Sequence, residues 1–463
     1  MTLIKSISGI RGTIGGRPGE GLSPVDVVKF SAVYGSWLKS QCRRERPVVV
    51  LGRDARISGE TICRLVVATL QNIGIDVIDL GLSTTPTVEM GVIMEKAEGG
   101  IVLTASHNPK HWNALKLLDG HGEFLSEESV EFVLDLADKG EFSFVEVDQL
   151  GRYELRKDYI QKHIEVILTL PLIDVQAVKA SRFKIVVDAV NSTGGIAVPM
   201  LLQALGVETV KLYCEPNGHF PHNPEPLREH LGEICKKVPA VQADLGIAVD
   251  PDVDRLALIC EDGEPFGEEY TLVAVADYVL EKKVGSAVSN LSSSRALRDV
   301  ALAKGGAYYP AAVGEVYVVK KMKQVDAVIG GEGNGGIIYP ELHYGRDALV
   351  GIALFLTHLA HFGRPISQLR MKYPHYFMSK QKIELSTGTD VEGILQAVTE
   401  RYKKEHLDLT DGVKIDFEEE WAHLRKSNTE PIIRIYTESI SQAKADALAQ
   451  RFLNEIPQMV SVF

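Results

Sequence analysis

The sequence predicts a multidomain α/β protein whose last part is a smaller α+β unit. Its 463 residues exceed one ordinary core and correspond to about three domains, at roughly 150 residues each. Short β-branched runs alternate with longer helical patterns, which is typical of parallel strands covered by helices on both faces. Towards the C-terminus, strand patterns instead accumulate around helix-like segments, as in a mixed α+β domain.

The alternation of strand and helix is clearest at three places along the chain. "RPVVVLG" (46–52) precedes the helical pattern "ISGETICRLVVATLQNIG" (57–74), and "FKIVVDAV" (183–190) precedes "GIAVPMLLQALG" (195–206). "ADLGIAV" (243–249) is followed further on by "YTLVAVADYVLEKK" (270–283). The C-terminal unit contains "KQKIELSTG", "GVKIDFEE", "WAHLRKS" and "PIIRIYTES", which read as strands.

Polar or turn-rich stretches divide these patterns into units of ordinary domain size. The breaks are "EVDQLGRYELRKDY", "DPDVDR" with "EDGEPFGE", and "FGRPISQLRMKYPHYF". We therefore predict domains over residues 1–152, 153–254, 255–369 and 370–463.

Composition excludes some classes of partner. The net charge of −12 opposes nonspecific attraction to nucleic acid or an anionic membrane, so a bound phosphate needs a local basic site. The five cysteines are scattered without CxxC spacing, as expected for reduced thiols in a cytosolic protein. Because the sequence shows neither a signal-peptide pattern nor a long apolar run, we expect a soluble, cytoplasmic protein.

The first candidate site is "GGIVLTASHNP" (99–109), in which an apolar strand pattern runs into Ser106. Ligands of parallel sheets bind at the carboxyl ends of strands, where this hydroxyl would lie. His107 is the adjacent residue and on a strand would point elsewhere. A helix cap or a turn explains "SHNP" equally well, because Ser and Asn serve both.

The second is "LGIAVDPDVDRLALI", in which Asp250, Asp252 and Asp254 alternate. In an extended loop this period brings three carboxylates to one side, where Mg2+ would relieve their repulsion. An EF-hand would place Glu261 at its last ligand position, but Arg255 stands where that loop requires glycine. A solvated acidic turn and an aspartyl nucleophile remain alternatives.

The third candidate is the glycine-rich turn "GGEGNGG" (330–336), where Glu332 could accept hydrogen bonds from sugar hydroxyls. On its own, such a turn has no specific function.

The fourth is "RKSNTEPIIR" (425–434), which combines two arginines with neutral donors and suits a phosphate. A solvated charged loop is its alternative. The predicted phosphate-binding residues are Arg425, Ser427, Asn428, Thr429 and Arg434.

In this order, "TASHNP", "DPDVDR", "GEGNGG" and "RKSNTEP" resemble the motifs of the α-D-phosphohexomutase superfamily. "SGIRG", "GRDARISG" and "FPHNPEP" extend the resemblance over essentially the whole chain, although Pro251 and Val253 stand where relatives have glycines. The resemblance implies a heart-shaped molecule of four domains around one cleft. The first three would be α/β domains with mixed sheets, and the last a C-terminal α+β domain.

The resemblance also implies roles for individual residues. Ser106 would carry a phosphate and, with the three aspartates, hold one Mg2+ per chain, while a hexose 1,6-bisphosphate serves as intermediate and activator. Lys116, with Arg11 beside it, would be an acid/base, because crowded cations lower the pKa of a lysine. We include His107 in the catalytic set. The predicted substrate-binding residues are Arg255, Glu315, Glu332 and Asn334.

Glu315 bears on the choice of substrate. Mannose-type members resemble one another in having a histidine there, whereas an acid could pair with the 2-ammonium of glucosamine. We therefore expect an isomerase of glucosamine 6-phosphate and glucosamine 1-phosphate, acting as a monomer or homodimer. A mannose or glucose phosphate mutase, an inactive sugar-phosphate-binding protein, a Mg2+ phosphatase and a Glu315 that simply faces solvent remain alternatives.

Overall fold

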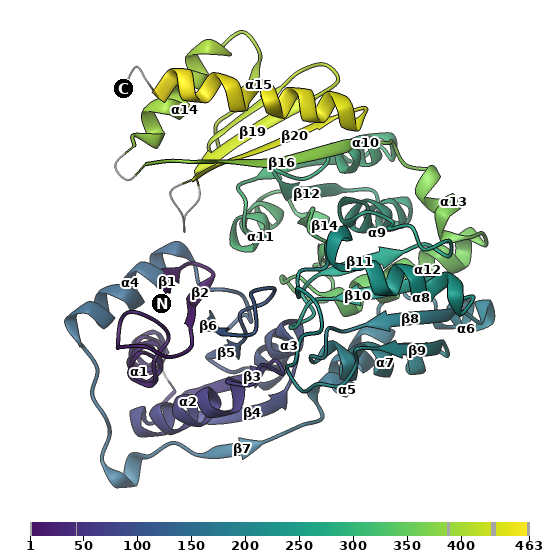
Figure 1. Cartoon of the computed structure of the whole chain (residues 1–463). Coiled ribbons are helices and arrows are strands. Elements are labelled where there is room, and N and C mark those ends of the chain that lie inside the picture. The colour runs from purple at the N-terminus through teal and green to yellow at the C-terminus, as the bar shows by residue number, and fades with distance from the viewer. Residues whose placement is uncertain (1, 43, 387–388, 427–431, 461–463) are drawn as a thin grey trace.

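The computed structural model describes residues 2–42, 44–386, 389–426 and 432–460. Within these ranges the strands form four separate sheets. The domains built on them lie along an arc, with the first and the fourth at its two ends (Figure 1). This confirms the predicted four-domain α/β architecture with a C-terminal α+β domain.

The first domain contains a mixed sheet in the order β1-β2-β6-β5-β3-β4-β7. Strands β5, β3, β4 and β7 are parallel, and the remaining neighbours pair antiparallel. The strands are β1 (Leu3–Ser6), β2 (Gly9–Thr13), β3 (Val48–Arg53), β4 (Asp76–Leu82), β5 (Gly99–Leu103), β6 (Trp112–Leu118) and β7 (Tyr153–Leu155). The helices are α1 (Pro24–Gln41), α2 (Gly59–Ile73), α3 (Thr85–Glu95) and α4 (Glu127–Lys139), with a 3-10 turn at Val147–Gln149.

Alternation along the central strands gives this sheet a core on each face. Val49 and Leu51 of β3 belong to the core that α1, α2 and α4 cover, whereas Val50 belongs to the core beneath α3. Successive strand side chains point to opposite faces, so an apolar run without polar interruptions requires helices on both sides. The carboxyl end of β5, from which the Ser106 loop continues, is therefore supported by helices on both faces of the sheet.

The second and third domains contain smaller mixed sheets, in the orders β11-β10-β8-β9 and β13-β12-β14-β15. In each, one edge strand, β11 or β15, runs antiparallel to its neighbour. The strands are β8 (Lys184–Asp188), β9 (Glu208–Leu212), β10 (Leu245–Val249), β11 (Leu256–Ile259), β12 (Ser286–Asn290), β13 (Ala307–Ala311), β14 (Ala327–Glu332) and β15 (Gly336–Ile338).

One continuous apolar core joins these two domains, and it includes residues of α5, α7, α9 and α12. The helices of both domains are α5 (Tyr159–Leu168), α6 (Val175–Ser181), α7 (Gly194–Ala204), α8 (Gly232–Ala240), α9 (Glu268–Lys282), α10 (Ala296–Ala303), α11 (Glu315–Gln324), α12 (Ala348–Phe362) and α13 (Ile366–Met371), with a 3-10 turn at Arg228–His230. Because a shared core resists relative movement, the second and third domains act as one support for the site.

The fourth domain is an antiparallel sheet in the order β16-β20-β19-β18-β17, on which α14 and α15 pack. The elements are β16 (Phe377–Glu384), α14 (Val391–Arg401), β17 (His406–Asp408), β18 (Val413–Asp416), β19 (Trp421–Lys426), β20 (Ile432–Ser439) and α15 (Gln442–Val460). The four strand patterns predicted for this unit correspond to β16, β18, β19 and β20, and β17 was not predicted.

Three predicted domain boundaries differ from the observed pairing. The boundary at 152/153 separates β7 from the first sheet, and the one at 254/255 separates β11 from the second. The third, at 369/370, falls inside α13. At 254/255 a polar turn precedes an edge strand of the same sheet, and at the other two places the polar stretch itself contains β7 or α13, so a polar stretch alone does not fix a boundary.

None of the helices in the described ranges is long and apolar enough to cross a membrane. All five cysteines lie in these ranges and are free thiols.

Candidate active site

The acidic run occupies the loop between β10 and β11 and is fully buried. Carboxylate oxygens of Asp250, Asp252 and Asp254 all lie within 4.8 Å of one another. Asp250 Oδ1 accepts the backbone N–H of Asp254 at 3.1 Å and of Arg255 at 3.2 Å, and Val253 has a φ of 64°. The loop is therefore a tight turn around the first carboxylate, and the predicted extended loop is wrong.

This oxygen cluster fits a hard divalent cation. Among the described residues, Asp252 Oδ1 and Asp254 Oδ1 are buried without a hydrogen-bond partner. Burial, reinforced by the charges of Asp254 and Asp252, raises the pKa of Asp250 well above its ordinary value. A bound cation would give the unpartnered oxygen atoms a partner and would relieve the repulsion between the carboxylates. A site whose ligands are all oxygen atoms suits Mg2+.

The EF-hand alternative is wrong. Leu256–Ile259 is strand β11, directly after the acidic loop. Glu261 instead accepts hydrogen bonds from the backbone N–H and the hydroxyl of Ser367. The twelfth residue of the presumed calcium loop therefore contacts the segment at α13 and not the acidic cluster.

Ser106 lies just beyond the end of β5, as predicted, and faces the acidic cluster. Its hydroxyl donates to Asp250 Oδ2 at 2.8 Å, and its backbone φ is 47°, in the left-handed region. His107 does not point elsewhere, because its Nδ1 lies 3.3 Å from Ser106 Oγ, and burial lowers the pKa of His107 well below its ordinary value. The left-handed conformation of Ser106 is unfavourable for a residue other than glycine. Contacts around the loop must offset this free-energy cost.

Arg56, for which no role was predicted, supplies those contacts. Its buried guanidinium donates to four backbone carbonyls of the Ser106 loop, at Ser106, Asn108, Pro109 and Trp112. Asp54 Oδ2 accepts from Arg56 Nε at 3.0 Å. The motif "GRDARISG" thus contains Asp54 and Arg56, which hold the serine loop in place. The motif was the feature of the sequence that could have identified these two residues.

Lys116 lies on β6 and reaches the acidic loop. Its Nζ donates to Asp252 Oδ2 at 2.7 Å and lies 3.4 Å from Asp254 Oδ2. Burial alone would lower its pKa, but these two carboxylates outweigh burial and raise it. The predicted lowering is wrong for this arrangement, because the nearest charges are negative. Arg11, on β2, donates to Asn108 Oδ1 at 2.7 Å and so lies beside the Ser106 loop.

Arg346, which the sequence analysis also left without a role, joins the acidic loop to the predicted sugar site. Its guanidinium lies 2.7 Å from Asp254 Oδ2, 2.8 Å from Glu315 Oε2 and 2.8 Å from Glu332 Oε2. All four side chains are buried. The alternative in which Glu315 faces solvent is therefore wrong.

The glycine-rich turn connects β14 and β15 and positions Glu332. Asn290 Nδ2 donates to Glu332 Oε1 at 2.8 Å, and Asn334 Nδ2 lies 3.5 Å from Oε2. A side chain at Gly331 would place its Cβ 2.0 Å from Gly336 O, so the close approach of these two strands requires glycine.

Only part of the predicted phosphate-binding site in the fourth domain lies within the described ranges. Arg425 on β19 and Arg434 on β20 are cross-strand partners, and Arg425 Nε lies 3.7 Å from Asp411 Oδ2. Lys380, on β16, adds a cation that the sequence analysis missed. The other three predicted phosphate-binding residues lie outside the described ranges: Ser427, Asn428 and Thr429.

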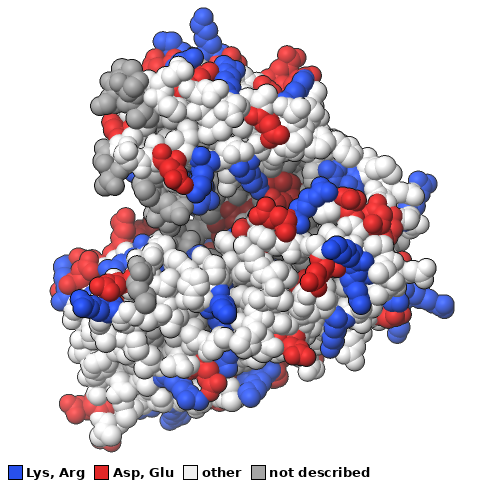
Figure 2. Space-filling model, viewed as in Figure 1, with Lys and Arg blue, Asp and Glu red and all other residues white. Residues whose placement is uncertain are grey.

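Most of the predicted site residues line one cavity of about 430 Å³, and the buried Asp250 and Asp252 contact its lining residues Ser106 and Lys116. Figure 2 shows the molecule hollowed between the fourth domain, at the top, and the first domain, at the lower left, with charged side chains along the opening. Arg255 is held there by Glu225 of "FPHNPEP", at 2.9 Å. The predicted site residues that line the cavity are Arg11, Ser106, His107, Lys116, Arg255, Glu315, Glu332, Asn334, Arg425 and Arg434.

A larger cavity of about 660 Å³ lies between the first domain and α5 and α7. It is lined by residues such as Cys63, Asp79 and Met200 and by none of the predicted site residues. Size alone therefore does not identify the site.

The fold and the cavity place this chain among the phosphohexomutases, enzymes of the isomerase class. Four consecutive domain models of one family match it, described as phosphoglucomutase/phosphomannomutase alpha/beta/alpha domains I, II and III and C-terminal domain. They cover residues 3–144, 157–263, 267–376 and 380–455. The chain belongs to the phosphoglucomutase/phosphomannomutase family.

Relatives agree with this assignment over nearly full length. A phosphoglucomutase/phosphomannomutase of Thermococcus kodakarensis is 37% identical over 94% of this chain and 95% of its own. A probable phosphoglucosamine mutase of Methanopyrus kandleri is 32% identical over 98% and 97%. The crystal structure of a phosphoglucomutase/phosphomannomutase family protein from Burkholderia thailandensis superposes with a TM-score of 0.85, at 25% identity, over 99% and 98% of the two chains.

Proposed function

We propose that this protein is a phosphoglucosamine mutase that interconverts glucosamine 6-phosphate and glucosamine 1-phosphate. Ser106 would carry a phosphate and give it to the free hydroxyl of the substrate, at C1 or C6. The resulting glucosamine 1,6-bisphosphate would return its other phosphate to Ser106 and leave as the isomeric monophosphate. The observation that carries this proposal is the contact of Ser106 Oγ, which lines the cavity, with the buried Asp250 Oδ2.

Phosphoryl transfer requires alignment and neutralisation of charge more than covalent assistance. Mg2+ held by Asp250, Asp252, Asp254 and the Ser106 phosphate would supply positive charge at the transferred group. Arg56 fixes the serine backbone, so the phosphate is presented in one direction. Lys116 keeps Asp252 and Asp254 in place and adds positive charge at this end of the cavity.

The other phosphate of the substrate would bind at the opposite wall of the cavity. Arg425 and Arg434 supply the guanidinium groups there, and we propose that Ser427, Asn428 and Thr429 complete the site. The intermediate must turn by about half a rotation between the two transfers, since either phosphate has to reach Ser106. Glu332 would accept sugar hydroxyls in both orientations.

The choice of glucosamine rests on Glu315. Its carboxylate lines the cavity beside Arg346 and offers a negative partner for the substrate 2-ammonium. The Methanopyrus relative is named for this activity, whereas the more similar Thermococcus relative is named phosphoglucomutase/phosphomannomutase. That name favours glucose or mannose phosphates as the second candidate substrates. We further propose a cytoplasmic enzyme, monomeric or homodimeric, with no nucleic-acid or membrane partner.

Replacing Ser106 tests the proposal. We expect Ser106→Ala to lower kcat for glucosamine 6-phosphate by at least about 10³-fold, because it removes the phosphate carrier. The measurement is a coupled assay of the 1-phosphate product, together with intact mass. A fraction of the native protein should carry one phosphate that the variant lacks.

Ser129→Ala, in the exposed first turn of α4, is the matched control and should keep both activity and the phosphate. A near-native rate for Ser106→Ala would remove Ser106 from the reaction. Steady release of inorganic phosphate by the native protein would indicate a phosphatase, and binding without turnover would indicate an inactive relative.

A further inference from the structure

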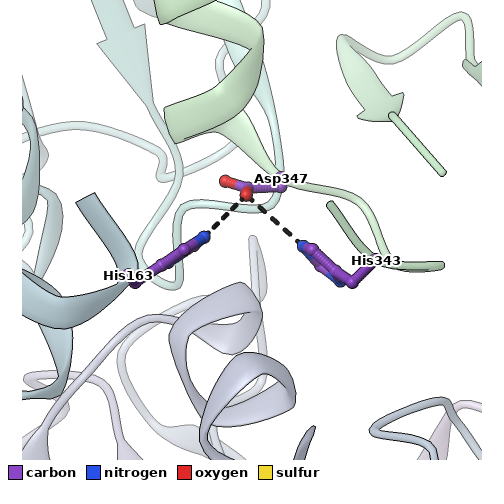
Figure 3. Close-up of side chains that lie close together, drawn as sticks. All are labelled: His163, His343 and Asp347. Carbon is purple, nitrogen blue, oxygen red and sulfur yellow. Dashed lines mark hydrogen bonds and ion pairs between the residues drawn. The ribbon is translucent and has the colours of Figure 1, made fainter. Parts of the chain in front are cut away.

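A second buried cluster lies outside the cavity, where the first three domains meet. His163 comes from α5, and Asp347 is the N-cap residue of α12, four residues after His343 (Figure 3). His163 and Asp347 are fully buried, and His343 is 5% exposed. Residues from distant parts of the chain therefore place two imidazoles around one carboxylate.

The distances within this cluster match those between ligands of one metal ion. Asp347 Oδ2 lies 3.0 Å from His163 Nε2 and 3.4 Å from His343 Nε2. Two tetrahedral ligands of Zn2+ lie about 3.3 Å apart, given bonds of about 2.0–2.1 Å. Asp347 Oδ1 is occupied by the backbone N–H groups of Leu349 and Val350, which leaves Oδ2 directed at the imidazoles.

The far nitrogen of His163 forms a hydrogen bond, and that of His343 lies near a carboxylate without forming one. Thr87 Oγ1 lies 3.0 Å from His163 Nδ1, and Glu89 Oε2 lies 3.3 Å from His343 Nδ1. Metal-bound histidines characteristically direct their second nitrogen at such an acceptor, which fixes the ring and leaves Nε2 for the ion. Both partners come from α3 of the first domain.

Hydrogen bonds within the cluster leave several of its polar atoms unsatisfied. In the described part of the chain, His163 Nε2, His343 Nδ1 and both oxygens of Glu89 are buried without a hydrogen-bond partner. An ion bound at His163 Nε2 would give this buried nitrogen the partner that it lacks.

We propose that His163, His343 and Asp347 form a structural site for a divalent transition-metal ion, with Zn2+ as the expected occupant. Imidazole ligands favour Zn2+ over Mg2+, which prefers oxygen atoms. Three protein ligands leave one coordination position for water. Because Arg346 immediately precedes Asp347, an ion here would also hold the segment that carries Arg346 into the active cavity.

The loop that carries Gly345 closes one side of the cluster. A Cβ added at Gly345 would lie 2.1 Å from Glu89 Oε2 and 3.0 Å from His343 Cε1. The loop therefore packs directly on the two side chains, and a small ion fits this site better than an organic ligand would.

Metal content of the full-length protein tests this site. The protein is stripped with a chelator, incubated with Zn2+ in excess Mg2+, freed of unbound metal by gel filtration and analysed by mass spectrometry of the elements. Excess Mg2+ keeps the aspartate loop filled, so Zn2+ reports on the second cluster. We expect about one Zn2+ per chain, falling below about 0.1 in His163→Gln and His343→Gln.

His361→Gln is the matched control, because His361 Nε2 also lies 3.0 Å from an aspartate, Asp174, but on the surface. It should keep about one Zn2+ per chain. If the native protein retains no Zn2+, the proposal is wrong. This outcome does not depend on whether any variant folds. Unchanged Zn2+ content in a folded His163→Gln protein would overturn it as well.

Discussion

The two buried clusters of possible metal ligands differ in donor atoms, in surroundings and in position along the chain. Asp250, Asp252 and Asp254 offer only oxygen atoms, come from one turn and contact Ser106 and Lys116 of the cavity wall. The cluster of His163, His343 and Asp347 offers two nitrogen atoms and one oxygen, comes from separate segments and lies outside that cavity.

This difference is the one expected between the catalytic site and the structural site that we propose. An ion that must contact substrate phosphate and exchange ligands during a reaction needs hard oxygen atoms and an open side. An ion that joins domains stabilises the fold more when its ligands are nitrogen atoms and are buried. Ligands far apart in sequence add to this stabilisation, because the ion then closes long loops. The following predictions test whether the two clusters are independent, beginning with the largest effect.

Asp250→Asn should affect the first cluster alone. We expect kcat/KM to fall by at least about 10²-fold, because a neutral amide holds the cation and Ser106 less well. We also expect the Tm of the metal-free protein to rise, because one of three mutually repelling carboxylates is gone. Steady-state kinetics and thermal unfolding measure these changes. A simultaneous loss of Zn2+ would show that the clusters are coupled.

Glu315→Gln tests the link between the clusters, because Arg346 holds Glu315 while the adjacent Asp347 belongs to the second cluster. We expect KM for glucosamine 6-phosphate to rise about tenfold, and by less for glucose 6-phosphate, which lacks the ammonium group. Zn2+ content should not change. Glu123→Gln, which removes an ion pair with Lys323, is the control. Equal effects on both substrates would contradict the amine pairing.

Glu269 provides a smaller test, because it is a carboxylate of the cavity wall that belongs to neither cluster. Burial raises the pKa of Glu269 to about 8, although Lys380 opposes this. Between the unfolded and folded pKa values the folded state holds a proton that the unfolded chain has lost. Stability due to this group therefore falls as pH rises from about 4.5 to about 8.

Glu269→Gln should remove that pH dependence. We expect the variant to gain more free energy of unfolding, relative to the native protein, at about pH 8 than at about pH 5. Urea unfolding at the two pH values measures the difference. Parallel changes at both values would show that Glu269 does not titrate in this range.

Local sequence determined the residue types of the active site, because each motif is short and consecutive. "DPDVDR" contains three carboxylates within five residues, and "TASHNP" ends a strand whose apolar run requires burial on both faces. The alternation of strands and helices was predictable for the same reason, since periodicity is a property of neighbouring residues. The short edge strands β7 and β17 were not predicted as strands, because "YEL" and "HLD" lack an apolar period, whereas "LALI" of β11 was predicted.

Tertiary structure decided what depends on residues far apart in the chain. Ser106 and Asp250 meet across 144 positions, and only folding shows that Arg56 holds the serine loop while Arg346 joins three carboxylates. The sign of the Lys116 pKa shift was wrong from sequence, because it depends on which charges fold around the amine. His163, His343 and Asp347 carry no motif, so their convergence follows from the packing of domains and not from any local pattern.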